Sequence, residues 1–436
     1  MHVRTGTFAI ALLLSTATAA AQQPVRAPGA PIGEAVFGDC MKGLRSQAAA
    51  AGVSGAAFDT HTAGLAPDLS VLELLDAQPE FTTPIWDYLA ALVDSQRVSD
   101  GRAMLKTHAS TLEQVSRKYG VDPATVVAVW GVESDYGQTF GKRPLLTSLS
   151  TLSCFGRRQP FFRGELFATL QLLQSGDLRA EGLTGSWAGA FGHTQFMPST
   201  YRRIAVDGDG DGRRDLVGSI PDALASTANY LRKSGWQTGR PWGQEVRLPA
   251  NFNTALAGRK NKRALSDWIA RGVTGVDGRP LTASDAQAGI LLPAGIKGPA
   301  FVVFRNFDAI YSYNAAESYA LAIAHLSDRL RGGGAFAAAW PTDDPGLGRV
   351  ERKQLQELLL ARGHAIGEAD GLIGTLTRRA IVAEQQRLGL QPQDGRAGMK
   401  VLKALQAGPG AQSRTTLPAA SPPAAPVEAK SPVKKR

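Results

Sequence analysis

Apolar residues recur at helical spacing along most of residues 35–332, and this repeat limits the possible folds more than any other feature of the chain. The periodic segments run over 36–51, 70–77, 83–93, 101–118, 123–134, 161–174, 221–233 and 315–330. Between about 243 and 310 the pattern changes, because short β-branched and aromatic runs such as 301–304 stand among turn residues. The sequence therefore predicts a mainly α body with a small β-containing insertion.

The segments that flank this body have a different composition. Residues 22–34 are rich in Pro, Gly and Ala and predict a linker. Glycines and a Pro/Asp-rich stretch over 333–345 predict a second linker, which is followed by a compact unit at 346–408. Residues 409–436 carry Pro, Ala and Ser but no aromatic residue, so burial cannot offset their ordering entropy and we expect a disordered tail.

Residues 1–21 have the parts of a secretory signal peptide. Arg4 gives a positive start, residues 8–14 are apolar, and small residues at 19–21 precede Gln22. The alternative is a buried N-terminal helix. Export makes nucleic acid a poor partner for the net charge of +10 and favours an anionic wall polymer or membrane surface. No run of about 18 apolar residues follows, so we expect no transmembrane segment after signal cleavage.

The two cysteines, Cys40 and Cys154, exclude a disulfide-scaffolded mini-protein and a Cys-rich zinc module. Export permits a disulfide between them, and two free buried thiols are the alternative. Cys40 does not directly follow the predicted signal peptide, and the residues before it include Phe37 and Asp39 rather than small residues only. A lipid anchor is therefore not expected at Cys40. The six histidines are scattered and form no HExxH motif, which leaves zinc chemistry little support.

One acidic residue, Glu133, falls in the last turn of the apolar helix that follows Asp122 and Pro123. Gly137 is the predicted stop of this helix. The negative end of the helix dipole and the apolar neighbours both raise the pKa of a carboxyl group at this place. A raised pKa suits a general acid that must hold its proton near neutral pH. The alternative is a solvated glutamate at a helix end.

Three blocks of residues carry a family resemblance. They are GVESDYG at 131–137, SWAGAFGHTQFMPS at 186–199 and YNAAESYA at 313–320. In this order they resemble the catalytic domain of the lytic murein transglycosylase B family, which includes membrane-bound and soluble members. The resemblance covers roughly residues 35–332 and implies a lysozyme-like (α+β) catalytic domain.

The resemblance implies an activity as well as a fold. The family cleaves the β-1,4 bond between N-acetylmuramic acid and N-acetylglucosamine in peptidoglycan and leaves a 1,6-anhydro end. Glu133 would protonate the glycosidic oxygen and then, as a carboxylate, take the proton of the muramic acid 6-hydroxyl. An internal nucleophile has a high effective molarity, so the second carboxylate of a hydrolytic glycosidase is not required. The chain would thus be a lyase acting on polysaccharides without an organic cofactor.

The same resemblance implies a set of substrate-binding residues. Ser186 and Gln195 match positions that hydrogen-bond the sugar or its N-acetyl group. The residues that match the lining of the cleft are Tyr88, Tyr230, Tyr313, Asn314 and Tyr319. Flat aromatic faces suit the apolar faces of sugar rings, while their hydroxyls reach polar groups. His193 stands where the family varies, and we assign it no role.

An acidic loop resembles the opening of an EF-hand, with carboxylates at loop positions 1, 3 and 5. Position 12 is Gly218 rather than Glu, and the family resemblance implies a longer loop closed by an aspartate, with Asp215 as a competing ligand. The expected ligands are Asp207, Asp209, Asp211, Arg213 through its backbone carbonyl, and Asp222. We expect a structural Ca²⁺ ion; the alternative is an Asp-Gly turn that binds no metal.

The C-terminal unit at 346–408 resembles the small three-helix peptidoglycan-binding module of many cell-wall hydrolases. Its two Asp-Gly turns and a helix opening near Thr377 carry this resemblance, and a generic helical domain is the alternative. A tethered wall-binding module would raise the local substrate concentration at the catalytic domain.

These observations predict an exported, periplasmic lytic transglycosylase that acts as a monomer on the glycan strands of peptidoglycan. Other cell-wall enzymes are candidate protein partners, and nucleic acid is not. A muramidase-type hydrolase on the same fold is the first alternative, and it would need a carboxylate that holds water across from Glu133. A non-catalytic wall-binding protein and a calcium sensor are further alternatives.

Overall fold

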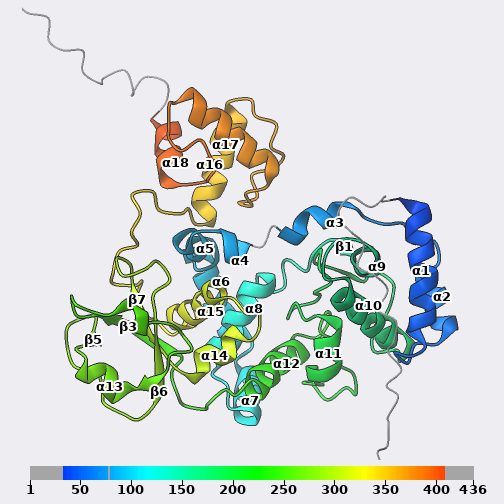
Figure 1. Cartoon of the computed structure of the whole chain (residues 1–436), viewed down its shortest axis with the longest axis horizontal. Coiled ribbons are helices and arrows are strands. Elements are labelled where there is room, and N and C mark those ends of the chain that lie inside the picture. Colours follow the sequence, from blue (N-terminus) through cyan, green and yellow to red (C-terminus); the bar gives the residue numbers. More distant parts are fainter. Residues whose placement is uncertain (1–32, 77–78, 408–436) are drawn as a thin grey trace, which may run out of the picture. The chain divides into compact units, whose positions relative to one another are not determined.

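The computed structural model describes residues 33–76 and 79–407, which form two compact units (Figure 1). The first unit combines residues 33–76, 141–191 and 196–203, and the second combines 79–140, 192–195 and 204–407. The predicted signal peptide, nearly all of the first linker and the predicted tail lie outside the described residues. Within these ranges, no helix is both long enough and apolar enough to cross a bilayer.

The first unit is mostly helical. Its elements are α1 (Glu34–Ala48), α2 (Gly55–Thr62), α3 (Ser70–Glu73), a 3₁₀ turn (Leu74–Asp76), β1 (Arg143–Pro144), α9 (Leu145–Cys154), α10 (Gln159–Gln174), β2 (Thr184–Gly185) and α11 (Pro198–Ile204). Helix α9 packs along α10 and also contacts α1 and α3. Eight of the ten residues of α9 are buried, so this helix forms the centre of the unit.

A disulfide joins α1 to the end of α9. Cys40 and Cys154 are 114 residues apart in the sequence, and their Cα atoms lie 5.8 Å apart. The sequence left open whether these thiols pair, and the structure pairs them. Because the bridge closes a long loop, it removes much of the conformational freedom of the unfolded chain.

The second unit contains a helical body, a small sheet and the C-terminal helices. Its helices are α4 (Pro79–Thr82), α5 (Ile85–Leu92), α6 (Ser95–Thr107), α7 (Ala109–Tyr119), α8 (Pro123–Ser134), α12 (Ile220–Lys233), α13 (Leu265–Ala270), α14 (Arg305–Tyr311), α15 (Glu317–Leu330), α16 (Arg349–Ala361), α17 (Thr375–Arg387) and α18 (Met399–Gln406), with a 3₁₀ turn at Thr254–Leu256. Its strands are β3 (Gly243–Arg247), β4 (Arg263–Ala264), β5 (Thr274–Gly275), β6 (Gln287–Leu291) and β7 (Ala300–Val303).

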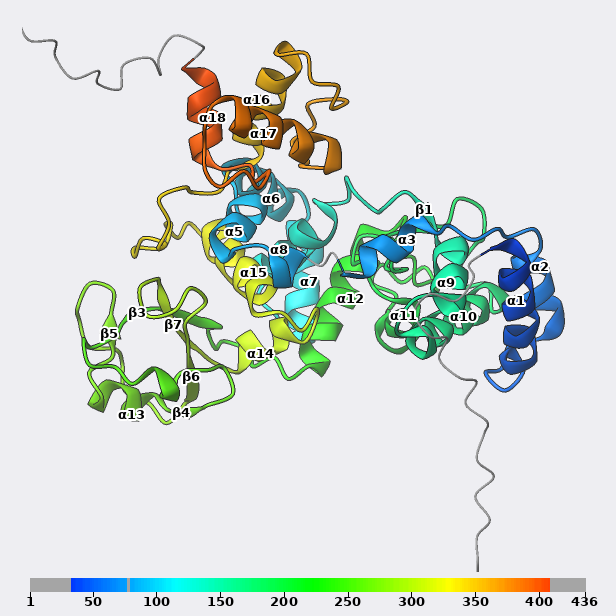
Figure 2. The same cartoon turned by 45° about the horizontal axis from the view of Figure 1, so that its top comes forward.

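Helix α8 lies at the centre of the helical body, where it packs against α6, α7, α12 and α15 (Figure 2). The Asp122 side chain caps its first turn by accepting a hydrogen bond from the backbone N–H of Thr125 at 2.9 Å. Every residue from 124 to 131 is buried, as expected for a helix that is apolar on all sides. The helix ends at Ser134, the last residue of the predicted segment. Left-handed φ values of 51° at Asp135 and 58° at Tyr136 stop it, before the predicted stop residue Gly137.

Two predicted helices differ from the structure, and the first is 70–77, where α3 covers four residues and a 3₁₀ turn follows. The segment 101–118 is divided between α6 and α7, and the break is at His108, whose φ and ψ are −105° and 23°. Helix α6 begins well before the predicted start because the Asp94 carboxylate caps it, accepting from the backbone N–H of Arg97 at 3.0 Å. The predicted helices at 123–134 and 221–233 agree with α8 and α12 to within one residue.

The predicted β-containing insertion is a five-stranded antiparallel sheet. The strand order is β4-β6-β7-β3-β5, and Val302 of β7 lies opposite Gln244 of β3 on one side and Ile290 of β6 on the other. Trp268 of α13 is fully buried beside the sheet and donates from Nε1 to the carbonyl of Ala288 at 2.8 Å. The fold is therefore mainly α with a small sheet, as predicted.

The C-terminal residues form three helices, α16 to α18, around a small apolar core, as predicted. Two buried glutamines hold the two Asp-Gly turns of this module. Gln356 Oε1 accepts from the N–H of Gly371 at 2.6 Å, and Gln385 Oε1 accepts from the N–H of Gly395 at 2.9 Å. A glycine follows each aspartate because both turns require a left-handed φ, which is 81° at Gly371 and 72° at Gly395.

The disulfide generates the first prediction. We expect the double variant Cys40→Ser/Cys154→Ser to lose about 2–4 kcal/mol of unfolding free energy, because the unfolded chain regains the freedom that the bridge removes. Thermal and denaturant unfolding followed by circular dichroism would measure the loss. A reducing agent should destabilise the wild type and leave the double variant unchanged. Equal stability of the two proteins under oxidising conditions would contradict the prediction.

Candidate active site

Glu133 lies in the last turn of α8, and its carboxyl group is held from a second helix. The Tyr319 hydroxyl of α15 donates a hydrogen bond to Glu133 Oε1. Burial raises the pKa of Glu133 to about 8; the hydrogen bond from Tyr319 opposes this rise, and the negative charge of Glu80 adds to it. The negative end of the α8 dipole acts in the same direction as burial. Glu133 is therefore mostly protonated at neutral pH, as a general acid must be.

Three of the predicted tyrosines form a row beside this acid. The ring centroids of Tyr230 and Tyr313 lie 4.6 Å apart, and those of Tyr313 and Tyr319 lie 6.3 Å apart. The Tyr230 hydroxyl donates to the carbonyl of Ser312 at 2.7 Å, and the Tyr313 hydroxyl donates to the carbonyl of Thr194 at 2.9 Å. These bonds join α12 and the 192–195 loop to the segment that precedes α15, so the row is fixed in place.

Tyr88 and Asn314 both lie near Glu80, an acid of α4. Burial and the charges of Glu80 and Glu133 all raise the pKa of Tyr88, which places its hydroxyl within electrostatic reach of both acids. Asn314 donates from Nδ2 to Glu80 Oε1 at 3.5 Å, at the limit of a hydrogen bond. The Ser318 hydroxyl donates to the backbone carbonyl of Glu80 at 2.6 Å.

Glu80 acts on Glu133 through its charge, and the sequence analysis did not name it. It lies in α4, a helix of four residues, and belongs to none of the three family blocks. The sequence contained no signal for it, because a glutamate in a short segment 53 positions before Glu133 comes near that acid only through the packing of α15. The structure thus brings a second carboxylate into the surroundings of Glu133.

The 192–195 loop is tied to the end of α8. Gln195 has a left-handed φ of 47°, and its Nε2 donates to the carbonyls of Gly192 at 2.9 Å and Phe140 at 3.3 Å. His193, to which the sequence assigned no role, accepts at Nδ1 from Trp130 Nε1 at 2.9 Å. Its backbone carbonyl accepts from the Ser134 hydroxyl at 2.8 Å. Burial lowers the pKa of His193 to about 4, so the ring is neutral and can accept this bond.

A network of charges holds the turn that follows Glu133. Asp135 Oδ1 accepts from Arg97 Nη2 at 3.2 Å and from Arg349 Nη2 at 2.8 Å. The hydroxyl of Tyr136 donates to the backbone carbonyl of Arg97 at 2.8 Å. Left-handed backbone at two successive non-glycine residues costs free energy, and these contacts offset that cost. Arg349 is the first residue of α16, so the C-terminal module contributes directly to this network.

Ser186 is in the first unit, directly after β2. Its hydroxyl accepts from the backbone N–H of Ala190 at 3.1 Å, and its own N–H donates to the carbonyl of Ala190 at 2.7 Å. These bonds fix a tight turn within residues 186–190. Its role in sugar binding stays a prediction.

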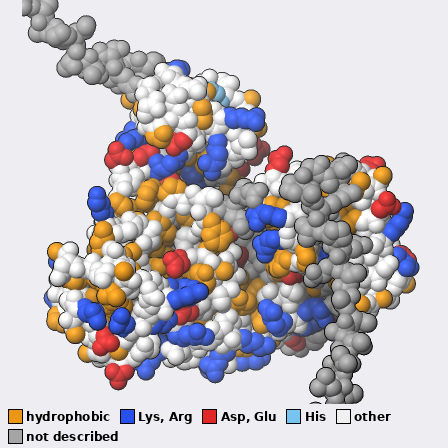
Figure 3. Space-filling view, viewed as in Figure 1, with side chains coloured by type: hydrophobic (Ala, Val, Ile, Leu, Met, Phe, Trp, Pro, Cys, Tyr) orange, Lys and Arg blue, Asp and Glu red, His pale blue; other side chains and the backbone are white. Residues whose placement is uncertain are grey.

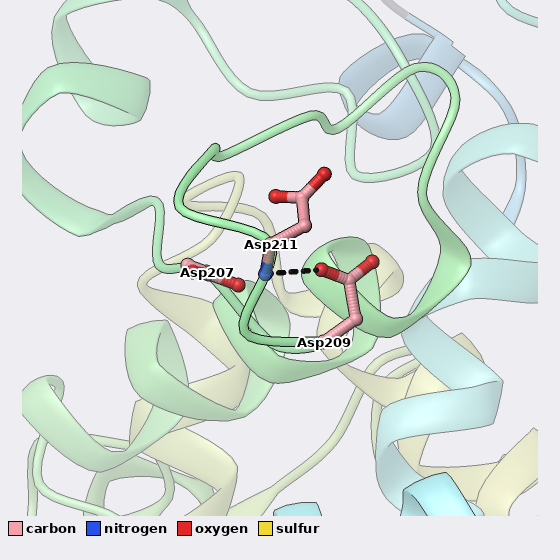
Figure 4. A group of neighbouring side chains, drawn as sticks. All are labelled: Asp207, Asp209 and Asp211. Atoms are coloured by element: carbon pink, nitrogen blue, oxygen red, sulfur yellow. Dashed lines mark hydrogen bonds between the residues drawn. The ribbon is translucent and has the colours of Figure 1, made fainter.

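The acidic loop brings three of the predicted metal ligands together. Carboxylate oxygens of Asp207, Asp209 and Asp211 lie within 4.8 Å of one another (Figure 4). Asp207 is also the acceptor for the backbone N–H of Gly212 at 2.8 Å, so the loop curls around its first carboxylate. Arg213 donates from its backbone N–H to Asp211 at 2.8 Å. Oxygen ligands of this kind suit a hard divalent cation, so the donor set fits Ca²⁺.

Asp222 is placed differently from the other expected ligands. Its side chain is fully buried at the start of α12, and its two carboxylate oxygens accept from the backbone N–H groups of Gly208 at 2.7 Å and Asp215 at 2.6 Å. It therefore closes the loop by hydrogen bonds at both ends. Its coordination of a cation stays a prediction.

Comparison with known proteins gives two family matches. A model described as the transglycosylase SLT domain matches residues 36–328, and one described as a putative peptidoglycan binding domain matches residues 348–405. The membrane-bound lytic murein transglycosylase B of Escherichia coli (strain K12) is 33% identical over 273 residues, which are 59% of this chain and 73% of that protein.

Two solved structures extend the similarity. SltB3 from Pseudomonas aeruginosa, in complex with NAG-anhNAM-pentapeptide, is 48% identical with a TM-score of 0.68, and the match covers 85% of this chain and 99% of that one. The Escherichia coli lytic transglycosylase Slt35, in complex with calcium, is 29% identical with a TM-score of 0.58, and the match covers 68% of this chain and 92% of that one.

The contacts of Glu133 generate opposite predictions for two variants. Tyr319→Phe should raise the pKa of Glu133 further, because the lost hydrogen bond favours the charged carboxylate. Glu80→Gln should lower this pKa, because a neighbouring negative charge is removed. Carbon-13 NMR titration of labelled glutamate carboxyls would measure both shifts, with Glu133→Gln identifying the signal. Shifts in the same direction would contradict the assignment of these two contacts.

Proposed function

Because the chain belongs to the lytic murein transglycosylase B family and is a peptidoglycan lytic transglycosylase, we propose that Glu133 is its single catalytic acid and base. The proposed reaction breaks the β-1,4 bond between N-acetylmuramic acid and N-acetylglucosamine and forms a 1,6-anhydro-muramic acid end. One observation carries this proposal: a carboxyl group with a pKa raised to about 8 ends a buried helix and is hydrogen-bonded by a buried tyrosine.

In the first step Glu133 gives its proton to the glycosidic oxygen, and the bond from that oxygen to C1 of the muramic acid breaks. The raised pKa supports this step, because the group is protonated at neutral pH before the substrate arrives. Burial around Glu133 also strengthens the electrostatic interactions that the developing positive charge at C1 would feel.

In the second step the 6-hydroxyl oxygen of the same muramic acid bonds to C1, and its proton passes to the Glu133 carboxylate. This returns Glu133 to its starting protonation state without water. The hydrogen bond from the Tyr319 hydroxyl supports the carboxylate form, because it lowers the pKa of Glu133. Burial thus favours the protonated acid of the first step, and the hydrogen bond from Tyr319 favours the carboxylate of the second step.

The remaining predicted residues bind the glycan in this proposal. The Tyr230 and Tyr313 rings offer flat faces for sugar rings next to Tyr319. Gln195 uses its amide nitrogen for two backbone carbonyls, so a sugar N-acetyl group would meet the amide oxygen. Tyr88, Asn314 and Ser186 complete the set, and the last of these is proposed from the family resemblance alone.

The substrate in this proposal includes strands whose muramic acid carries a peptide stem. The SltB3 structures are complexes with NAG-NAM-pentapeptide and with NAG-anhNAM-pentapeptide, so the relative holds a sugar with its stem attached. The catalytic domain would span 35–332 and the wall-binding domain 346–408. With residues 1–21 as a signal peptide, the enzyme would act in the periplasm.

Hydrolysis is the second candidate reaction, and Glu80 is the observation that favours it. A muramidase needs a second carboxylate to activate water, and the charge of Glu80 acts on Glu133. The two reactions differ in their products, because hydrolysis leaves reducing ends rather than anhydro ends. Glu80→Gln would therefore abolish hydrolysis but leave transglycosylation in place.

A structural Ca²⁺ ion is the further part of the proposal. Asp207, Asp209 and Asp211 would supply carboxylate oxygens and Arg213 a backbone carbonyl. The Slt35 structure is a complex with calcium, which supports the choice of this ion. The ion would neutralise the repulsion among three carboxylates and stabilise the loop that leads into α12.

The third prediction concerns the catalytic acid. Glu133→Gln should lower the turnover on purified peptidoglycan by about 10³-fold or more, because the amide can neither give nor take the proton. Mass spectrometry of the released muropeptides would measure the loss, and anhydro-muramyl products should come from the wild type alone. Reducing-end products from the wild type would replace transglycosylation with hydrolysis. Equal release by both proteins would remove Glu133 from the mechanism.

The fourth prediction concerns the metal. Saturating Ca²⁺, at about 100 times its dissociation constant, should add about 2.7 kcal/mol to the unfolding free energy, and a chelator should reverse the gain. Asp209→Asn should abolish this response. Asp277→Asn, in an exposed Asp-Gly turn outside the loop, is the matched control and should keep it. Calorimetric unfolding with and without Ca²⁺ measures this response. An unfolding free energy of the wild type that does not change with Ca²⁺ would contradict the proposal.

A further inference from the structure

A basic pocket of about 480 Å³ lies between the β-containing insertion and α14. Four cationic side chains line it, namely Arg259, Lys260, Lys262 and Arg305, and we call this depression the basic pocket. The single acid in its lining is Asp308. Figure 3 shows Lys and Arg side chains gathered over the part of the molecule where Figure 1 draws α14.

The single acid is already paired. Asp308 accepts from Arg259 Nη1 at 2.7 Å and lies 2.9 Å from Lys262 Nζ. Lys260 and Arg305 are exposed at the same pocket, so its net charge is positive after Asp308 is counted. A local excess of positive charge in a concave site raises the local concentration of anions.

The two cations next to Asp308 are held inside the pocket wall. Arg259 Nε is buried and makes no hydrogen bond among the described residues, and Lys262 Nζ is buried at 2.9 Å from Asp308 Oδ2. Glu317 approaches Arg259 Nε only to 3.9 Å, too far for a hydrogen bond. An anion in the pocket would therefore meet the exposed side chains of Lys260 and Arg305 first.

The pocket adjoins the proposed catalytic cleft. Tyr311 and Ser312 line it, and the next residue, Tyr313, belongs to the aromatic row beside Glu133. The Arg259 guanidinium stacks over the Tyr311 ring at 3.6 Å, and the Ser312 carbonyl accepts from the Tyr230 hydroxyl. One wall of the basic pocket is therefore continuous with the wall that would hold the sugar.

We propose that the basic pocket binds a carboxylate of the peptide stem while the muramic acid that carries this stem occupies the cleft. This inference rests on the proposed function, because it names a second contact of the same substrate. The stem begins at the muramic acid and ends in a carboxylate, and arginine and lysine donors suit that group. The pocket would favour stem-bearing strands over bare glycan.

The test changes the two exposed cations and leaves the pair at Asp308 intact. Lys260→Glu/Arg305→Glu should raise KM for stem-bearing glycan strands about tenfold with kcat unchanged. The same variant should match the wild type on strands whose stems have been removed by an amidase. The charge-matched control is Arg271→Glu/Arg279→Glu, on the same insertion but outside the pocket, and it should leave both values unchanged.

Two results would overturn the inference. The first is a KM of the Lys260→Glu/Arg305→Glu variant on stem-bearing strands that equals the KM of the control variant. The second is a rise in KM on bare strands as large as the rise on stem-bearing strands, which would make the pocket a general glycan contact. If the wild type releases no product at all, the proposed function fails instead.

Binding then tests the pocket without catalysis. In the Glu133→Gln background, calorimetry should show that the free stem pentapeptide binds and that its C-terminal amide binds about tenfold more weakly. Adding Lys260→Glu/Arg305→Glu should remove this difference. Binding of inorganic phosphate together with equal affinity for the two peptides would assign the pocket to another anion and overturn the inference.

Discussion

The arrangement of the second unit depends on burying one ionisable carboxyl group at the negative end of an apolar helix. Residues 124–131 of helix α8 are buried, and desolvation of Glu133 in the last turn raises its pKa to about 8. A buried acid is stable only when it keeps its proton or finds partners. Here the Tyr319 hydroxyl is the partner, and α15 must pack along α8 to supply it. The same packing places the aromatic row beside the acid, so the raised pKa of Glu133 and the position of the tyrosines have one origin.

The turn after Glu133 shows how the fold maintains that position. Asp135 and Tyr136 both adopt left-handed backbone, and they are held by ion pairs of Asp135 to Arg97 and Arg349 and by the hydroxyl bond of Tyr136. The residue before them, Ser134, donates to the His193 carbonyl of the 192–195 loop. Arg349 comes from the C-terminal module, and Arg396 of that module pairs with Asp87, the neighbour of Tyr88, at 2.6 Å. The module therefore contacts residues one and two positions away from the proposed site residues Tyr88 and Glu133, in addition to its proposed role in wall binding.

Much of the site was predictable because its parts follow from local rules. The helix of Glu133 has a cap, a proline start and an apolar body, and these place the acid in the last turn whatever the rest of the chain does. The tyrosines and Gln195 came from blocks whose order implies a family. Glu80 and the structural role of His193 were not predictable, because neither stands in a pattern that a single sequence reveals. Glu80 acts on Glu133, 53 positions away, and His193 accepts from Trp130, 63 positions away.

The sequence by itself determined the helical body, the strand-bearing insertion, the three C-terminal helices and the acid at a helix end, because periodicity, caps and turns act over a few neighbouring residues. Tertiary structure alone decided two other features. It paired Cys40 with Cys154, and it turned both oxygens of Asp222 to backbone N–H groups. Each of these depends on a distance between segments remote in sequence, and such distances exist only once the chain has packed.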